Sequence, residues 1–269
     1  MKSILFWMEF HHNARALILW TVIICALVFF TMSLFRSVLQ YKEQIMTMIS
    51  LVPAAAVKAR GFGNIGDIFS GLGFYVANNV VYMMLLGSIY SIILTSNILL
   101  KEEYGKTAEY LMSRPISRDE IFTAKLMLSA VNILALNLAS GIIGYIALVI
   151  FDPEHARVVP FLVISLYTLL LNLFFGALGL AIAVAVKRAR PMTSFCVGLV
   201  LIFYFLFTIS RITGVQGDFG YISPFKWVNV EVLNPAYGLE AWRIGLFLGF
   251  FILLIAFSAM VYRKKDILT

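Results

Sequence analysis

Six long stretches of apolar residues, free of Lys, Arg, Asp and Glu, divide the chain. They cover residues 16–35, 68–100, 126–151, 158–186, 191–210 and 244–262. A helix needs about 20 apolar residues to cross a hydrocarbon core about 30 Å thick, and backbone inside a bilayer must satisfy its own hydrogen bonds. The stretches lack the polar–apolar alternation that marks the strands of a membrane β-barrel. The pattern therefore predicts an all-α integral membrane protein with six transmembrane helices.

The second stretch is longer than one span requires. Its first part, residues 68–78, holds Gly71, Gly73 and Asn78. We expect this part to be an interfacial or re-entrant lead-in, followed by a span that starts near Asn79. The whole chain is then a single membrane domain, residues 1–269, with spans at about 16–36, 79–100, 126–151, 158–186, 191–210 and 243–262.

Two shorter helices are expected outside the spans. Residues 2–13 combine large apolar side chains with Lys2 and Glu9, which is typical of an N-terminal interfacial helix on the inner surface. The alternative is that this segment merely extends the first span inward. Residues 41–50 predict a short surface helix in the first outer loop.

Basic residues decide the orientation of the spans. They gather between the fourth and fifth spans, at Lys187, Arg188 and Arg190, and again after the sixth span, at Arg263, Lys264 and Lys265. Short cytoplasmic loops carry an excess of Lys and Arg, so both termini are expected in the cytoplasm. The net charge of +7 reflects this bias. No basic stripe on a soluble face indicates nucleic acid as a partner.

Composition and motifs count against catalysis by the chain itself. Of its residues, 61% are hydrophobic and 13% are charged, against about 45–50% apolar and 25% charged in soluble domains. The sequence contains no G-x-x-x-x-G-K-[ST] phosphate loop, no H-E-x-x-H and no G-x-S-x-G. Cys25 and Cys196 lie within spans, and the three His residues lack metal-ligand spacing. We expect no enzyme activity, no cofactor and no metal on this chain.

Polar but uncharged residues recur inside the spans. Ion-coupled carriers usually need an ionisable residue there, so a self-sufficient carrier is disfavoured. Small residues repeat every four positions at Gly87, Ser91 and Thr95, a spacing that lets helices pack closely. The polar residues therefore either serve packing or line a translocation path. The candidates for such a path are Asn79, Tyr82, Thr95, Asn97, Asn132, Asn137 and Asn172.

The inner connection between the second and third spans, residues 101–125, is the most informative soluble segment. It continues as a helical stretch to Met112 and is broken at Arg114 and Pro115. Ser117 and Glu120 then follow the S-x-x-E capping-box pattern ahead of an apolar run. A new helix is thus predicted to begin at Ser117 and to lead into the third span. The segment is either a docking surface for a soluble partner or a solvated face that anchors the topology.

The same segment carries a family pattern. Residues 102–118 read E-E-Y-G-K-T-A-E-Y-L-M-S-R-P-I-S-R. This stretch resembles the cytoplasmic loop of ABC-2-type transporter permeases, and Lys125 matches the pattern too. Residues 73–75, 223–227 and 262–267 look like further family marks, so the resemblance covers the chain in order. One departure is Lys106 before Thr107, where the family usually has Gly directly before Thr.

The resemblance implies a permease subunit of an ATP-binding-cassette exporter in the cytoplasmic membrane. Two copies of the chain would pair as a homodimer, each with a separate ATPase subunit that holds ATP and magnesium. In such proteins the loop between the second and third spans carries the coupling helix, the surface helix before the first span also contacts the ATPase, and the first and fifth spans form the dimer seam. The ATPase-coupling interface would then comprise Glu102, Glu103, Lys106, Glu109, Arg114, Pro115, Ser117, Arg118 and Glu120.

Substrates in this family include peptide antibiotics, amphipathic peptide toxins, drugs, lipids and ions. Spans with Asn, Ser, Thr and Tyr but no charge favour a hydrophobic or amphipathic cargo, such as a peptide, a peptide toxin or antibiotic, or a drug. Two alternatives stay open, a non-transporting membrane scaffold or assembly subunit and an exporter of lipid or ions. The lack of catalytic groups disfavours an intramembrane enzyme.

Overall fold

A computed structural model describes residues 2–51, 69–104, 117–186, 192–212, 218–228 and 239–264. Every regular element in this part of the chain is helical. Six of its helices are long and apolar enough to cross a membrane. The prediction of an all-α protein with six spans is confirmed at this level.

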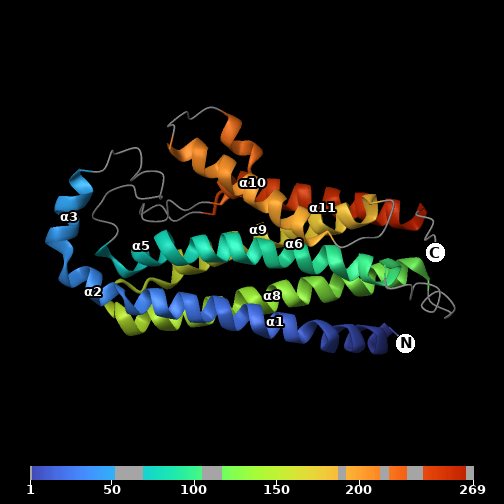
Figure 1. Cartoon of the computed structure of the whole chain (residues 1–269), viewed down its shortest axis with the longest axis horizontal. Helices are drawn as coiled ribbons and strands as arrows, with labels where there is room; N and C mark the ends of the chain where they lie inside the picture. The colour runs from blue at the N-terminus through green and yellow to red at the C-terminus, as the bar shows by residue number, and fades with distance from the viewer. Residues whose placement is uncertain are drawn as a thin grey trace.

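The first span belongs to a single long helix. Helix α1 runs without interruption over Lys2–Ser33, and α2 (Phe35–Gln40) and α3 (Lys42–Ser50) follow it. The expectation of a separate N-terminal interfacial helix is therefore wrong, and the alternative, an inward extension of the span, agrees with the structure. The physical reason is that residues 2–33 contain no Gly or Pro to break the helix. The short surface helix expected in the outer loop is confirmed as α3, which runs across the end of the bundle (Figure 1).

The second span begins earlier than expected. Helix α5 (Gly71–Tyr75) passes through a π-helical turn, η2 (Val76–Val80), directly into α6 (Val81–Tyr104). The candidate spanning segment is thus Gly71–Leu100. Over residues 71–78 the chain is helical and continuous with α6, so the prediction of a separate lead-in is wrong for these residues. The Ser70 hydroxyl accepts a hydrogen bond of 3.1 Å from the Gly73 N–H, so this serine caps the helix start.

The other four spanning helices lie near their expected positions. They are α8 (Arg118–Phe151), α9 (Val158–Ala185), α10 (Thr193–Ile212) and α11 (Ala241–Lys264). The described residues between them include three short 3-10 helices. One, η3 (Pro153–His155), lies between α8 and α9, and the other two, η4 (Asp218–Ile222) and η5 (Pro224–Trp227), lie between α10 and α11. The helix predicted to begin at Ser117 is continuous with the third span, as expected.

The helices associate in pairs along the long axis of the molecule. Helix α1 packs along α8, α6 packs along α9, α10 packs on α6, and α11 packs on α9 (Figure 1). The blue start of α1 and the red end of α11 lie at the same end of the molecule. This agrees with an even number of spans. That both chain ends lie in the cytoplasm stays a prediction from the basic residues.

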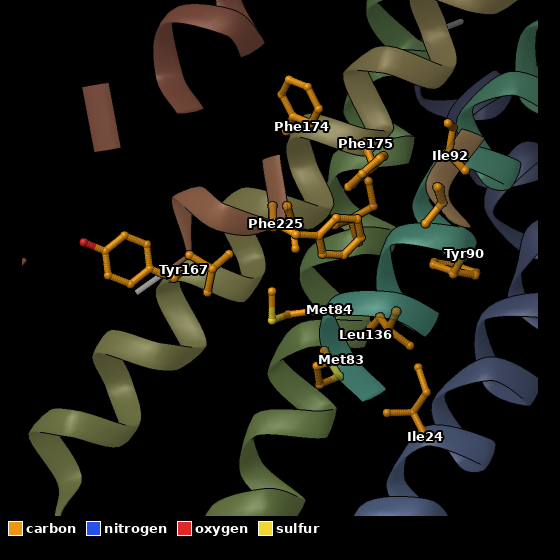
Figure 2. Close-up of a cluster of buried hydrophobic side chains, with 14 of the residues drawn as sticks. Ile24, Met83, Met84, Tyr90, Ile92, Leu136, Tyr167, Phe174, Phe175 and Phe225 are labelled. Carbon is orange, nitrogen blue, oxygen red and sulfur yellow. The ribbon is translucent and has the colours of Figure 1, made fainter. Parts of the chain in front are cut away.

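A core of large apolar side chains fills the middle of the bundle. Ile24 of α1, Met84 of α6, Leu136 of α8 and Phe175 of α9 belong to this cluster of buried side chains (Figure 2). All four are at most 2% exposed. The outer faces of α1, α10 and α11 instead carry exposed apolar residues, as expected for helices in contact with lipid or a second subunit.

Candidate functional site

The start of α8 forms a complete capping box. The Ser117 hydroxyl accepts a hydrogen bond from the Glu120 N–H at 3.3 Å, and the Glu120 carboxylate accepts one from the Ser117 N–H at 3.2 Å. Both bonds satisfy backbone N–H groups that the helix itself leaves without partners. The sequence prediction of this cap is confirmed, and the cap fixes the residue at which α8 begins.

The first two turns of α8 are joined to the end of α11. Asp119 Oδ1 accepts from Arg263 Nε at 2.7 Å, and Arg118 Nη1 donates to the Arg263 carbonyl oxygen at 3.4 Å. One turn further, the rings of Phe122 and Tyr262 lie 5.5 Å apart between centroids. The ion pair is exposed, so its own stabilisation is small, but the aromatic pair beneath it is buried.

Lys125 connects α8 with α6. Its side chain is only 1% exposed, and Nζ donates a hydrogen bond of 2.6 Å to the carbonyl oxygen of Ile98. In the sequence, Lys125 is the last residue of the connection between the second and third spans, and the contact with α6 is not predicted. Its spacing offered a signal, because Ile121, Lys125 and Leu128 follow one helix face and both apolar neighbours are buried.

The residues of the expected coupling interface lie only partly within the described part of the chain. Ser117, Arg118 and Glu120 lie at the N-terminal end of α8. Glu102 and Glu103 belong to the last turn of α6, but nothing is described of their side chains. Lys106, Glu109, Arg114 and Pro115 lie outside the described residues. Their role in docking stays a prediction.

Three polar residues from three helices meet in the core. Ser88 of α6 donates to Asn172 Oδ1 of α9 at 3.3 Å, and Asn172 Nδ2 donates to Asn137 Oδ1 of α8 at 3.0 Å. Asn137 Nδ2 in turn donates to the Ile133 carbonyl oxygen at 2.8 Å. Both asparagines are among the polar candidates in the sequence, but their contact with each other is not predicted there. Because these bonds lie inside one subunit, they hold α6, α8 and α9 together.

Glycines let α6 and α9 approach each other closely. A Cβ atom at Gly179 would lie 2.6 Å from the Ile92 carbonyl oxygen and would also collide with the Thr95 hydroxyl. A Cβ at Gly87 would lie 2.6 Å from Asn172 Nδ2. Thr95 itself donates to the Ser91 carbonyl oxygen at 2.9 Å. The small-residue spacing noted in the sequence therefore serves close packing at this contact.

The other candidates for a translocation path are distributed differently. Asn79, in the π-helical turn, is fully buried, and neither side-chain polar atom has a hydrogen-bond partner among the described residues. Asn132 Nδ2 donates to the Leu128 carbonyl oxygen at 2.8 Å. Tyr82 and Asn97 are half-buried and lie outside the Ser88–Asn172–Asn137 network. A path through these residues stays a prediction.

At the end of the bundle away from Ser117, a carboxylate joins the end of α8 to the start of α5. Asp152, directly after α8, accepts a hydrogen bond of 2.6 Å from the Gly71 N–H at the start of α5. The same carboxylate contacts His155 Nδ1 at 2.9 Å. A side chain at position 71 would overlap Asp152, since a Cβ there would lie 2.5 Å from the Asp152 Cβ. Glycine at this position is what lets the two elements touch.

The segment after α10 inserts an aromatic side chain into the bundle. Phe225 of η5 is 0% exposed, and its ring centroid lies 5.3 Å from that of Phe175 and 5.5 Å from that of Tyr204. The Ser223 hydroxyl donates to the Phe203 carbonyl oxygen at 2.7 Å and fixes the segment to α10. Ser223 and Phe225 belong to the stretch 223–227, which resembles the family pattern in the sequence.

A family model for ABC-2 family transporter proteins matches residues 4–267. The chain belongs to the ABC-2 transporter family. Curated proteins give no match. Membership agrees with the six apolar helices and makes this ABC-2 protein a multi-pass membrane transport component. In its described residues, no group of three His, Cys, Asp or Glu side chains is arranged to hold a metal ion.

Proposed function

We propose that this ABC-2 protein is the permease subunit of an ATP-driven exporter in the cytoplasmic membrane. A separate ATPase subunit binds at the inner end of the bundle and supplies the energy, with ATP and magnesium held on that subunit. Two permeases form a homodimer with two ATPases. The observation that carries the proposal is the family match over residues 4–267, in a chain whose sequence has no phosphate loop of its own.

The inner end of the bundle supports a docking role. The connection between α6 and α8 returns into a helix whose start is fixed by the Ser117–Glu120 capping box. The ends of α6 and α11 are bound to the first turns of that helix through Lys125 and Arg263. A soluble subunit can reach the protein only at such an end, and here its force would meet an ordered element.

The cargo we propose is hydrophobic or amphipathic, such as a peptide, a peptide toxin or antibiotic, or a drug. The support is the character of the faces that α1 and α10 leave exposed between subunits or to lipid. Within residues 18–30 of α1 and 195–209 of α10 the sequence has no charged residue. The exposed side chains there are apolar: Ile18, Leu19, Val22 and Phe30 on α1, and Phe195, Ile202, Phe205 and Ile209 on α10. An apolar surface offers little compensation for the desolvation of a charged cargo.

Co-purification tests the proposed function. The chain is purified in mild detergent together with a candidate phosphate-loop ATPase from the same genome, and the complex is placed in lipid nanodiscs. We expect a stable complex with two copies of each chain, whose ATP hydrolysis depends on the permease. An ATPase that fails to bind, or that hydrolyses ATP identically without this chain, would favour the scaffold alternative.

The capping box gives a first test of coupling. Replacing Ser117 and Glu120 together by Ala removes both cap bonds, at a cost of about 1 kcal/mol. That is too little to unfold a six-span protein but enough to displace the start of a docking helix. We expect normal membrane insertion and a clear fall in cargo export and in ATP hydrolysis stimulated by cargo, measured in membrane vesicles.

The matching control removes the same kind of interaction elsewhere. Replacing Ser70 by Ala deletes the cap of α5 at the outer end, where no ATPase can bind. This variant is expected to keep its coupling. If both variants lose coupling equally, the effect is a general loss of stability and not a property of the inner end.

A second prediction concerns the homodimer. A Cβ atom at Gly198 in α10 meets no atom within 4 Å in one subunit, so a larger side chain fits the isolated bundle. If α10 forms the seam, Gly198→Trp should weaken the dimer by about 1–3 kcal/mol through overpacking while insertion is unchanged. Size-exclusion chromatography with light scattering measures the shift to monomer, and Gly249→Trp, on an equally open part of α11, should leave the dimer intact.

A further inference from the structure

The inner ends of three spanning helices are joined by contacts that the proposed function does not by itself require. Lys125 joins α8 to α6, and the pair Asp119–Arg263 joins α8 to α11. We propose that these two contacts make the inner ends of α6, α8 and α11 move as one body when the ATPase pushes on the loop. The inference deepens the proposed function and rests on it. Lys125, Asp119 and Arg263 are positioning residues in this scheme.

The hydrogen bond from Lys125 to Ile98 is the stronger of the two contacts. An ammonium group that is buried must be compensated by hydrogen bonds or opposite charge, because its desolvation is costly. Nζ finds such compensation at the Ile98 carbonyl oxygen of α6, 2.6 Å away. Separating α6 from α8 at this level would break this hydrogen bond of a buried ammonium group. This hydrogen bond therefore stabilises the contact between α6 and α8.

The Asp119–Arg263 pair is the weaker contact. Both side chains are more than half exposed, so water screens their attraction. The pair gains from the second bond, in which Arg118 donates to the Arg263 carbonyl oxygen. Beneath it, Phe122 and Tyr262 pack together, which keeps α11 beside α8. In this scheme the exposed Asp119–Arg263 pair can change its geometry when α8 tilts, and a displacement of α8 still reaches α11 through the aromatic contact.

The position of the loop explains why the contacts matter. The chain leaves α6 at Tyr104 and re-enters the bundle at Ser117 in α8. If the two helix ends were independent, a push on the loop would spread them apart and be absorbed there. Because Lys125 holds α6 to α8, the push displaces both helices together, and through Arg263 it also displaces α11.

The test follows an ATP-dependent change at the far end of the molecule. Spin labels are placed at Glu154 in η3 and Ile222 in η4, which are exposed at the end away from the loop. Cys25 and Cys196, the only two cysteines, are replaced by Ser in this background. The permease–ATPase complex in lipid nanodiscs is compared without nucleotide and after trapping with ATP and vanadate. The wild-type complex is expected to shift its label distance.

The variants separate the two contacts. Lys125→Met removes the charge and keeps the length, and it should reduce the equilibrium constant of the shift about tenfold, the size of a lost hydrogen bond to a charged group. Asp119→Arg and Arg263→Asp should each reduce it about two- to five-fold, as befits an exposed pair. The double change Asp119→Arg with Arg263→Asp restores an ion pair and should regain the wild-type shift. The ATPase should still co-purify with all of them.

The control is Lys264→Glu, an exposed charge reversal one residue beyond Arg263, which should keep the wild-type shift. If Lys125→Met and both single reversals also keep it, or if the double change is no better than the singles, the inference is overturned. Should Lys125→Met fail to fold, the three charge variants at exposed positions still decide the matter. A wild-type complex that hydrolyses ATP without any shift contradicts the proposed function itself, and the inference with it.

Discussion

Gly179→Val is expected to prevent α6 and α9 from packing. The new side chain would begin 2.6 Å from the Ile92 carbonyl oxygen, which belongs to the backbone of α6 and cannot rotate away. Overpacking of a well-filled core costs about 1–3 kcal/mol even where side chains can move aside; here the helices must separate, so we expect at least about 3 kcal/mol. The loss should appear as aggregation of the purified protein on size-exclusion chromatography.

Gly249→Val is the matched control for this substitution. It places the same side chain at a helical glycine of α11 where a Cβ atom meets nothing within 4 Å. This variant is expected to elute like the wild type. A Gly179→Val protein that elutes as a single sharp species with an unchanged unfolding temperature would show that the close α6–α9 contact is not needed for the fold.

Phe225→Ala is expected to release the segment after α10 from the bundle. The ring of Phe225 is fully buried between Phe175 of α9 and the aromatic side chains of α10, as Figure 2 shows for Phe175. Removing a buried Phe side chain costs about 3–5 kcal/mol when the site cannot collapse. We expect a lower unfolding temperature in detergent and faster proteolysis within residues 218–228.

An exposed phenylalanine provides the comparison for this loss. Phe257 on α11 is 41% exposed, so Phe257→Ala removes the same atoms without leaving a cavity. Its unfolding temperature should stay close to that of the wild type. Equal effects of the two changes would mean that Phe225 contributes only apolar surface and does not hold its segment in place.

The six spans were predictable because a bilayer imposes a length and an absence of charge, and both are visible along the sequence. The error at the second span shows the limit of this reading. Gly71, Gly73 and Asn78 predict an irregular lead-in, whereas Ser70 caps a helix that starts at Gly71. The irregularity is a π-helical turn at Val76–Val80, which does not interrupt the helical segment. The glycine at position 71 reflects the approach of Asp152, a contact across 81 residues that no local pattern reveals.

The site was predictable only where its interactions are local. The capping box joins residues three positions apart and was found from its spacing. The Asp119–Arg263 pair spans 144 residues and was not foreseen. Likewise, Asn137 and Asn172 were recognised as polar residues in spans, but their bond to each other depends on how α8 and α9 pack. Sequence spacing shows on which face of its own helix a residue lies, but it does not show which residue of another helix that face contacts.

The length of α8 turns a small motion at one surface into a larger one at the other. With 34 residues, the helix is about 50 Å long at 1.5 Å per residue, longer than the hydrocarbon core of about 30 Å. Ser117 caps one end of this helix, and the Asp152 carboxylate stands at the other end. A tilt of about 5° would swing one tip by about 4 Å relative to the other. Since the hydrogen bond from Gly71 to Asp152 is 2.6 Å long, such a swing either drags the start of α5 along or opens the far surface between these two residues.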